Sequence, residues 1–288
     1  MKPKTIIILS VLTLLIIFII AELVYSNNFL TIENYEIKTE KTSASFRAVL
    51  LSDLHNKEFG ADNEKLINLV KEQNPDVILT VGDFVTRFES DREVACKLLR
   101  KLTEIAPVYS SLGNHERSYY DYDNLINDIK STGVTLLDND LVEVELGGDT
   151  IVVGGLTDFP YYEFEAPDYD NERRHFLDRF IEREKDSFSI LLAHEPEFFM
   201  WGLDKKELDL MLSGHTHGGV IRLPFIGGLL APNQGFLAGQ GNILPTYTKG
   251  IYESDTATML ITAGLSSEVV LPRFNNPPEV CVIDVNPD

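Results

Sequence analysis

Short apolar runs that end in a polar side chain recur along this chain. Runs of β-branched and aliphatic residues predict buried strands, and five of them occupy residues 46–51, 76–81, 106–112, 187–193 and 208–212. Apolar residues at helical spacing predict helices in the first half, over residues 61–73, 92–105 and 123–131. Alternating strands and helices are typical of a layered α/β fold, so we expect that class.

Further strand patterns and one more helix complete the chain. The helix is expected over residues 172–185, and Gly147–Gly148 has the composition of a hairpin turn. The additional strands are expected at residues 35–38, 134–137, 141–146, 151–155, 248–252, 256–262 and 279–285. The strand over residues 35–38 is expected at the edge of a sheet.

The first 26 residues differ from the rest of the chain. Residues 5–21 form a run of 17 residues without a charge, dominated by Ile and Leu, and Lys2 and Lys4 precede it. This is the lower limit of length for a membrane-spanning helix, and it is longer than the apolar core of most signal peptides. We therefore expect residues 1–26 to be an uncleaved anchor in the cell membrane. A cleaved signal peptide, which would give a secreted protein, is the alternative.

The lysines predict the orientation of that anchor. Basic residues favour the cytoplasmic side, so the rest of the chain is expected outside the cytoplasm, held by a single span. Residues 27–45 are expected to be a polar tether with one edge strand, and residues 46–288 one large domain. With 288 residues and 44% hydrophobic content, the chain can bury a sizeable core.

Composition narrows the classes of partner. The net charge of −20 disfavours nucleic acid, because proteins that grip polynucleotides normally present an excess of Lys and Arg. Cys96 and Cys281 both lie among apolar residues. Two buried thiols are therefore expected, and not a disulfide framework.

The ends of the five apolar runs carry side chains that bind metals. They are Asp53, His55, Asp83, Asn114, His115, His194, His215 and His217. Ligands gather at the carboxyl ends of strands in open sheets, so these side chains are expected to meet. Imidazole and carboxylate ligands without thiolate suit Zn, Fe or Mn. Eight candidates are too many for one four-coordinate ion. Two metals sharing a carboxylate, roughly 3.5–4 Å apart, would use them and could promote displacement at phosphorus.

The order and spacing of these motifs resemble those of the calcineurin-like metallophosphoesterases, from about residue 46 to the C-terminus. The matching motifs are Asp53-x-His55, Gly82-Asp83, Gly113-Asn114-His115-Glu116, His194 and Gly214-His215-x-His217. The surroundings are similar to a bacterial membrane-associated branch that includes UDP-diacylglucosamine pyrophosphohydrolases and related phosphodiesterases. Val220 departs from the pattern, because many members have Gln there. The resemblance implies a four-layer sandwich of two facing mixed sheets flanked by helices.

The resemblance also implies a role for each motif residue. Asp53, His55 and His217 would hold one metal. Asn114, His194 and His215 would hold the other, and Asp83 would bridge the two. Mn is the first expectation for both ions, with Fe or Zn as alternatives.

The implied activity is hydrolysis of a phosphodiester or pyrophosphate bond, with metal-activated hydroxide attacking phosphorus. His115 would be the acid that protonates the leaving oxygen, or a cation that stabilises developing charge. Arg117 would contact phosphate, and His175 is given no role. Two other functions remain open: a metal-binding envelope scaffold without turnover, and a nuclease, which the charge disfavours.

Two loops are expected to matter for the substrate. Residues 159–170, rich in aromatic and acidic side chains, are expected to form a surface loop or a lid over the metals. Residues 223–250 form a long apolar loop directly after the histidine pair, and such loops are usually functional. We expect Phe225, Leu229 and Leu230 to contact the apolar part of a lipid-linked substrate. The alternative is a loop folded onto its own core.

Overall fold

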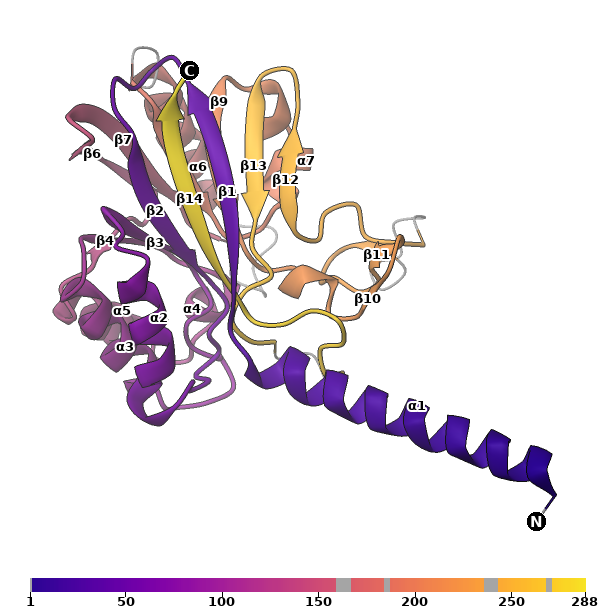
Figure 1. Ribbon diagram of the computed structural model, residues 1–288. Coiled ribbons are helices and arrows are strands. Elements are labelled where there is room, and N and C mark those ends of the chain that lie inside the picture. Colours follow the sequence, from indigo (N-terminus) through magenta and orange to yellow (C-terminus); the bar gives the residue numbers. More distant parts are fainter. Residues whose placement is uncertain (1, 159–166, 184–186, 236–242, 268–270) are drawn as a thin grey trace.

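The computed structural model describes residues 2–158, 167–183, 187–235, 243–267 and 271–288, with the backbone alone at residues 167–171 and 183 (Figure 1). Two six-stranded sheets face each other. The first has the order β1(Thr31–Thr39), β14(Glu279–Pro287), β2(Phe46–Leu51), β3(Val77–Val81), β4(Val108–Ser111) and β5(Thr135–Leu136). The second has the order β12(Gly250–Glu253), β13(Ala257–Ile261), β9(Leu208–Ser213), β8(Ser189–Ala193), β7(Asp149–Leu156) and β6(Asp140–Leu146). Both sheets are mixed, as expected.

Alternation along the strands builds the layers. In β2, Val49 and Leu51 pack on the helix side of the first sheet, whereas Ala48 and Leu50 pack between the two sheets. The helices α2(Glu64–Glu72), α3(Glu93–Thr103) and α5(Tyr122–Ser131) cover the outer face of the first sheet. α6(Pro167–Arg183) covers the outer face of the second, with Phe176 and Phe180 buried against β7. The expected four-layer sandwich is confirmed.

The parallel strands determine where the polar side chains meet. β2, β3 and β4 run parallel in the first sheet, and β7, β8, β9 and β13 run parallel in the second. Short elements follow several strand ends: α4(Asn114–Arg117), α7(Glu197–Met200), and 3-10 turns at Ala61–Asn63, Leu203–Lys205 and His217–Gly219. The carboxyl ends of β2, β3, β4, β8 and β9 therefore open on one side of the sandwich.

The N-terminal helix α1(Pro3–Asn28) projects away from the sandwich (Figure 1). Its 26 residues correspond to about 39 Å at about 1.5 Å per residue, longer than the roughly 30 Å core of a bilayer. By length and composition α1 is able to cross a membrane. Pro3 lies in the first turn, where its missing N–H has no helical partner in any case.

The segment after α1 is more structured than a tether. The edge strand expected at residues 35–38 is β1, which spans Thr31–Thr39 and pairs with β14 in parallel over its whole length. Residues 31–39 therefore belong to the first sheet. The expected Gly147–Gly148 hairpin turn is confirmed, since Leu146 and Asp149 pair on either side of it.

Two expected loops are only partly irregular. Residues 167–170 of the expected lid belong to α6, which begins five residues before the position expected, and residues 159–166 lie outside the described residues. Proline suits the first turn of a helix, which explains a start at Pro167. The apolar loop contains a short hairpin, β10(Arg222–Leu223) and β11(Gly227–Gly228). Cys96 and Cys281 are buried free thiols, as predicted.

Candidate metal centre

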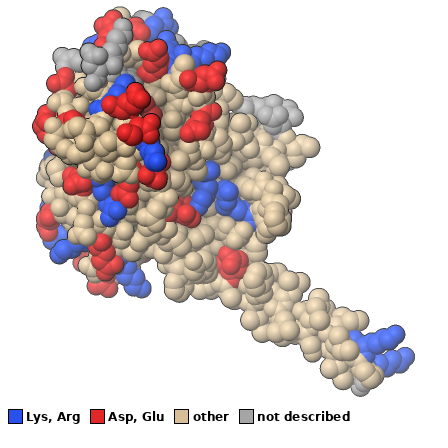
Figure 2. All heavy atoms as spheres, turned by 45° about the horizontal axis from the view of Figure 1, so that its top comes forward, with Lys and Arg blue, Asp and Glu red and all other residues tan. Residues whose placement is uncertain are grey.

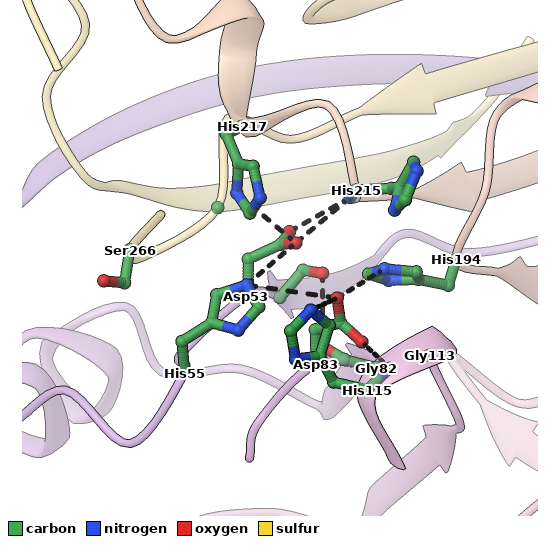
Figure 3. A network of polar contacts seen from close by, with 12 residues as sticks. Asp53, His55, Gly82, Asp83, Gly113, His115, His194, His215, His217 and Ser266 are labelled. Carbon is green, nitrogen blue, oxygen red and sulfur yellow. Dashed lines mark hydrogen bonds and ion pairs between the residues drawn. The ribbon is translucent and has the colours of Figure 1, made fainter. Parts of the chain in front are cut away.

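The histidines and aspartates at the strand ends converge on one site between the two sheets (Figure 3). Asp53 and His55 follow β2, and Asp83 follows β3. His194 follows β8, and His215 and His217 follow β9. Asn114 and His115 lie in the first turn of α4, directly after β4. The structure thus brings together Asp53, His55, Asp83, His194, His215 and His217, and it places Asn114 next to His115 at the start of α4.

Asp53, His55 and His217 form a first group. One ligand atom from each lies within 4.8 Å of the others, and all three residues are buried. Nδ1 of His217 is 3.6 Å from Oδ1 of Asp53, and Nε2 of His55 is 3.9 Å from the same oxygen. These three residues are the set that the family resemblance assigns to one metal.

Asp83, His194 and His215 form a second buried group within the same distance limit of 4.8 Å. Nε2 of His194 is 3.0 Å from Oδ2 of Asp83. The same oxygen is 3.9 Å from Nε2 of His55, so it faces both groups. Oδ1 of Asp83 instead accepts the backbone N–H of His115 at 2.9 Å. Asp83 is therefore the residue that two ions, one in each group, would share.

The unsatisfied atoms of the site fit metal ions. Within the described part of the chain, Nδ1 of His217 and Oδ1 of Asn114 are buried and have no hydrogen-bond partner. Buried polar atoms are nearly always paired, so such atoms need an explanation. Two cations, one beside each atom, would satisfy them. Since the donors are imidazole nitrogens and carboxylate or amide oxygens without thiolate, the set suits Mn, Fe or Zn.

Hydrogen bonds orient the histidine rings. Nδ1 of His194 donates to the carbonyl of Val81 at 2.6 Å, which leaves Nε2 as the ring nitrogen that faces Asp83. Nε2 of His215 lies 3.3 Å from Nδ2 of Asn233 and 3.9 Å from Oε1 of Glu195. Burial alone would lower the pKa of His194, but Asp83 holds it well above the ordinary value. Without a cation, Asp83 therefore favours the protonated form of the His194 ring.

His115 presents a donor to the site. Its Nδ1 accepts the backbone N–H of Arg87 at 3.2 Å, so the neutral ring carries its proton on Nε2. Nε2 is 4.0 Å from Oδ2 of Asp83. Burial lowers the pKa of His115, Asp83 opposes this, and the nearby Arg87 lowers it further. His115, His55 and Asp83 also satisfy the distance limit for a metal group, but this tautomer makes Nε2 of His115 a donor and not a ligand.

The strand ends turn sharply, and the backbone is strained there. Left-handed φ angles occur at Asp53 (54°), His55 (47°), Asp83 (57°), His215 (66°) and His217 (49°). Such a conformation costs roughly 1–2 kcal/mol for a residue with a Cβ. Backbone strain of this kind is concentrated at functional sites and persists only where the surrounding structure imposes it.

Glu116 imposes part of this backbone conformation. The sequence analysis gave this residue no role. Its buried carboxylate accepts the N–H groups of Asp83 at 2.7 Å, Phe84 at 2.7 Å, Val85 at 3.2 Å and Gly113 at 2.9 Å. These bonds fix the turn after β3 against the start of α4. The signal in the sequence was the fourth position of the Gly113–Glu116 motif.

Glycine is required where the turns approach the carboxylates. A Cβ on Gly113 would lie 2.2 Å from Oδ1 of Asp83, and one on Gly214 would lie 2.5 Å from Oδ2 of Asp53. Neither distance is possible without displacing a carboxylate. Larger residues at these two positions would therefore move Asp83 or Asp53.

The predicted substrate residues occupy different places. The guanidinium of Arg117 stacks on the ring of Tyr122 at 4.6 Å and donates to its hydroxyl, so it is directed toward α5. Leu229 and Leu230 are half-buried, and their N–H groups lie 3.2 Å from the carbonyl of Gly219, beside the His217 turn. Phe225 is fully exposed at the end of the β10–β11 hairpin. Their contacts with substrate stay a prediction.

Comparison with known proteins agrees with this geometry. The sequence model of the family described as "Calcineurin-like phosphoesterase" matches residues 46–219. That range contains both groups of ligands. It also accounts for more than half of the chain.

The curated relatives carry related names. The chain is 29% identical to "Uncharacterized metallophosphoesterase YkuE" of Bacillus subtilis, over 82% of this chain and 78% of that protein. It is 29% identical to "Phosphodiesterase YaeI" of Escherichia coli, over 84% of this chain and 83% of that protein. It is 30% identical to "Transmembrane protein with metallophosphoesterase domain" of Danio rerio, over 64% of this chain and 44% of that protein.

Proposed function

Because this chain belongs to the calcineurin-like phosphoesterase family, and is thereby a metal-dependent phosphoester hydrolase, we propose that it cleaves a phosphodiester or pyrophosphate bond with a pair of metal ions. The observation that carries the proposal is the single oxygen Oδ2 of Asp83, which faces two buried groups of nitrogen and oxygen donors. The name of the E. coli relative, a phosphodiesterase, favours a diester. Membership in the membrane-associated branch stays a prediction.

Each residue then has a defined task. Asp53, His55 and His217 would hold one ion, Asn114, His194 and His215 would hold the other, and Asp83 would be shared by both. When bound, the ions supply Lewis-acid charge that polarises water and the phosphate group. Mn is the first choice, with Fe or Zn as alternatives, because the donors are mixed nitrogen and oxygen.

His115 contributes chemistry of its own. Its Nε2–H points toward Asp83 and is placed to donate to the oxygen that leaves phosphorus. Arg87, whose backbone fixes the tautomer of His115 and whose charge lowers its pKa, is a nearby cation for the phosphate group. Arg117 is the other candidate, after turning away from Tyr122.

The substrate class is inferred from the proposed membrane anchor. We infer that residues 1–26 anchor the protein by a single span in the cell membrane, and that the catalytic domain, which includes β1 as well as residues 46–288, is extracytoplasmic. Lys2 and Lys4 support this orientation. The substrate is then a phosphorylated lipid or another envelope compound. Leu229 and Leu230, half-buried beside the His217 turn, are placed to contact its apolar part.

The experiment that tests the activity uses the full chain in detergent micelles with bis(4-nitrophenyl) phosphate. Hydrolysis should disappear with chelator and return with Mn²⁺, and Fe²⁺ and Zn²⁺ are compared in parallel. Full metal loading without hydrolysis of this ester or of any nucleotide-lipid, phospholipid or wall-precursor substrate would favour the scaffold. Degradation of DNA in preference to these compounds would favour the nuclease.

A second experiment tests the lipid substrate. Leu229→Gln and Leu230→Gln should raise KM for a lipid phosphate and leave bis(4-nitrophenyl) phosphate unaffected, because only the lipid uses that binding energy. Equal losses on both substrates would contradict the lipid assignment and leave the hydrolase assignment intact.

A further inference from the structure

The last two turns of α1 are fixed to the sandwich by hydrogen bonds. The N–H of Asn275 donates to Oε1 of Glu22 at 3.0 Å, and the N–H of Asn276 donates to Oγ of Ser26 at 3.1 Å. Ser26 is fully buried, and its hydroxyl donates to Glu22 at 2.6 Å. The helix is therefore joined to the domain by side chains of its own last turns, in addition to the covalent chain.

Asn27 adds a pair of hydrogen bonds between the end of α1 and Arg273. Its side-chain amide donates to the carbonyl of Arg273 at 2.9 Å, and its side-chain oxygen accepts the N–H of Arg273 at 3.1 Å. The guanidinium of Arg273 is itself buried and donates to the carbonyls of Ala263 and Gly264. The segment that receives α1 is thus fixed in the fold. The direction of α1 relative to the domain follows from this.

The β10–β11 hairpin is hydrogen-bonded to the same segment, at Phe274 and Asn275. The N–H of Arg222 donates to the carbonyl of Phe274 at 3.0 Å, and Nδ2 of Asn275 donates to the carbonyl of Arg222 at 3.2 Å. Ile221 and Phe274 also form an isolated parallel bridge. The hairpin and α1 leave the domain on the same side (Figure 1). A membrane that holds α1 therefore lies close to the hairpin.

The end of the hairpin exposes apolar side chains. Leu223 is 37% exposed, Phe225 109% and Ile226 55%. We call residues 223–226 the apolar tip. Residues 223–230 contain no charged side chain. A tight cluster of large apolar side chains in water is unfavourable and usually marks a contact surface.

The distribution of charge fits a lipid surface. The chain carries a net charge of −20, so an anionic membrane repels most of its surface. In Figure 2 the acidic side chains gather on the part of the molecule away from α1, whereas the lobe beside α1 is mostly uncharged. The apolar tip is therefore presented toward the membrane by a face that an anionic surface does not repel.

We propose that the apolar tip inserts into the interface of the bilayer that holds α1, as a second membrane contact. The proposal rests on the proposed anchoring by α1, not on the hydrolytic activity. Phe225 then faces bulk lipid, whereas Leu229 and Leu230 remain near the metals for substrate. Two contacts and a fixed joint hold the metal centre at a constant height and angle above the membrane surface.

The test measures contact with lipid directly. The full chain with Trp201→Phe and Phe225→Trp is reconstituted into phosphatidylcholine–phosphatidylglycerol vesicles, with or without brominated acyl chains. Emission from position 225 should shift to shorter wavelength and be quenched by the brominated lipid. Trp201, the single tryptophan of the wild type, is the control, because it is 54% exposed after α7, and α7 lies far from α1 in Figure 1.

The wild type should show much weaker quenching by the same vesicles. Equal quenching at positions 201 and 225 would overturn the proposal, as would a wavelength shift at position 225 without bromine quenching, which indicates a protein partner. Ile226→Trp in the Trp201→Phe background repeats the measurement if Phe225→Trp does not fold. Because no step reads hydrolysis, a negative result here leaves the proposed activity standing.

Discussion

The metal centre has two layers that are built differently. The inner cluster consists of the residues assigned to the ions, and each of them follows the end of a strand. The outer layer consists of residues 218–235 and 271–276, which hold the β9 turn, the hairpin and the end of α1 together. The inner cluster takes its geometry from the sheets. The outer layer takes it from side-chain hydrogen bonds between distant parts of the chain.

This difference predicts a gradient of effects. Inner residues are buried and share Asp83, so the loss of one leaves the others without a compensating partner. Residues that support the inner cluster act on metals only through the position of a ligand. Changes in the outer layer should therefore have smaller effects on chemistry than changes in the inner cluster.

The largest effect is expected for Asp83→Asn. An amide removes one negative charge from between two cations and bridges them poorly, so the loss should exceed the roughly 10–100-fold seen for residues that only support a ligand. Wild-type protein should contain about two metal equivalents, and the variant fewer, by elemental analysis. Asp123→Asn on the exposed side of α5 is the matched control. A fully active Asp83→Asn, or wild type without metal, would falsify the dinuclear site.

His115→Ala should come next. The ring donates from Nε2 and is not assigned as a ligand, so metal content should stay near wild type while kcat falls by roughly 10²–10⁴-fold. The loss should shrink for nitrophenol esters, whose leaving group needs little protonation. His175→Ala, on the exposed face of α6, should change nothing. An equal loss for good and poor leaving groups would assign His115 to charge stabilisation instead.

Glu116→Gln should have an intermediate effect. Each oxygen of Glu116 faces two backbone N–H groups, so the new NH₂ group would face two donors. Unsatisfied buried groups cost about 1–3 kcal/mol, and a displaced Asp83 should lower activity by roughly 10–100-fold. Thermal unfolding and kcat/KM measure the two effects. Glu104→Gln is the control, since its side chain is 60% exposed. If the variant is less stable but fully active, Glu116 contributes to folding and not to the position of Asp83.

The inner cluster could be predicted from the sequence because its signals are local. Asp53, Asp83 and His194 each come within two residues of an apolar strand. Parallel strand ends meet at one edge of a sheet, so position along the chain was enough to predict proximity. The α/β class followed from the alternation of strand and helix patterns, whereas the four layers were implied by the resemblance to the phosphoesterase family.

The outer layer, the place of β1 and the role of Glu116 could not be predicted, because their contacts join residues far apart in the chain. The partner of β1 is β14, at the other end of the sequence, so the polar residues after α1 resembled a tether. The role of Glu116 depends on the register of β3 and β4, in which Val81 pairs with Ser111. Asn276 has no local pattern at all, yet it contacts the His217 turn.

Asn276→Ala should have the smallest effect on metal binding. It is also the most direct test of the difference between the two layers, because it should affect one ion only. Nδ2 of Asn276 donates to the carbonyls of His217 at 2.7 Å and Val220 at 3.2 Å, so its loss frees the turn that carries His217. Affinity should fall by up to roughly 10-fold for the metal in the Asp53 group and stay unchanged for the other. Titration of the metals with a competing chelator resolves the two binding steps. Asn124→Ala, an exposed amide on α5, is the control. If both steps weaken equally, the outer layer supports the whole site through the fold, and the separation of the two layers is wrong.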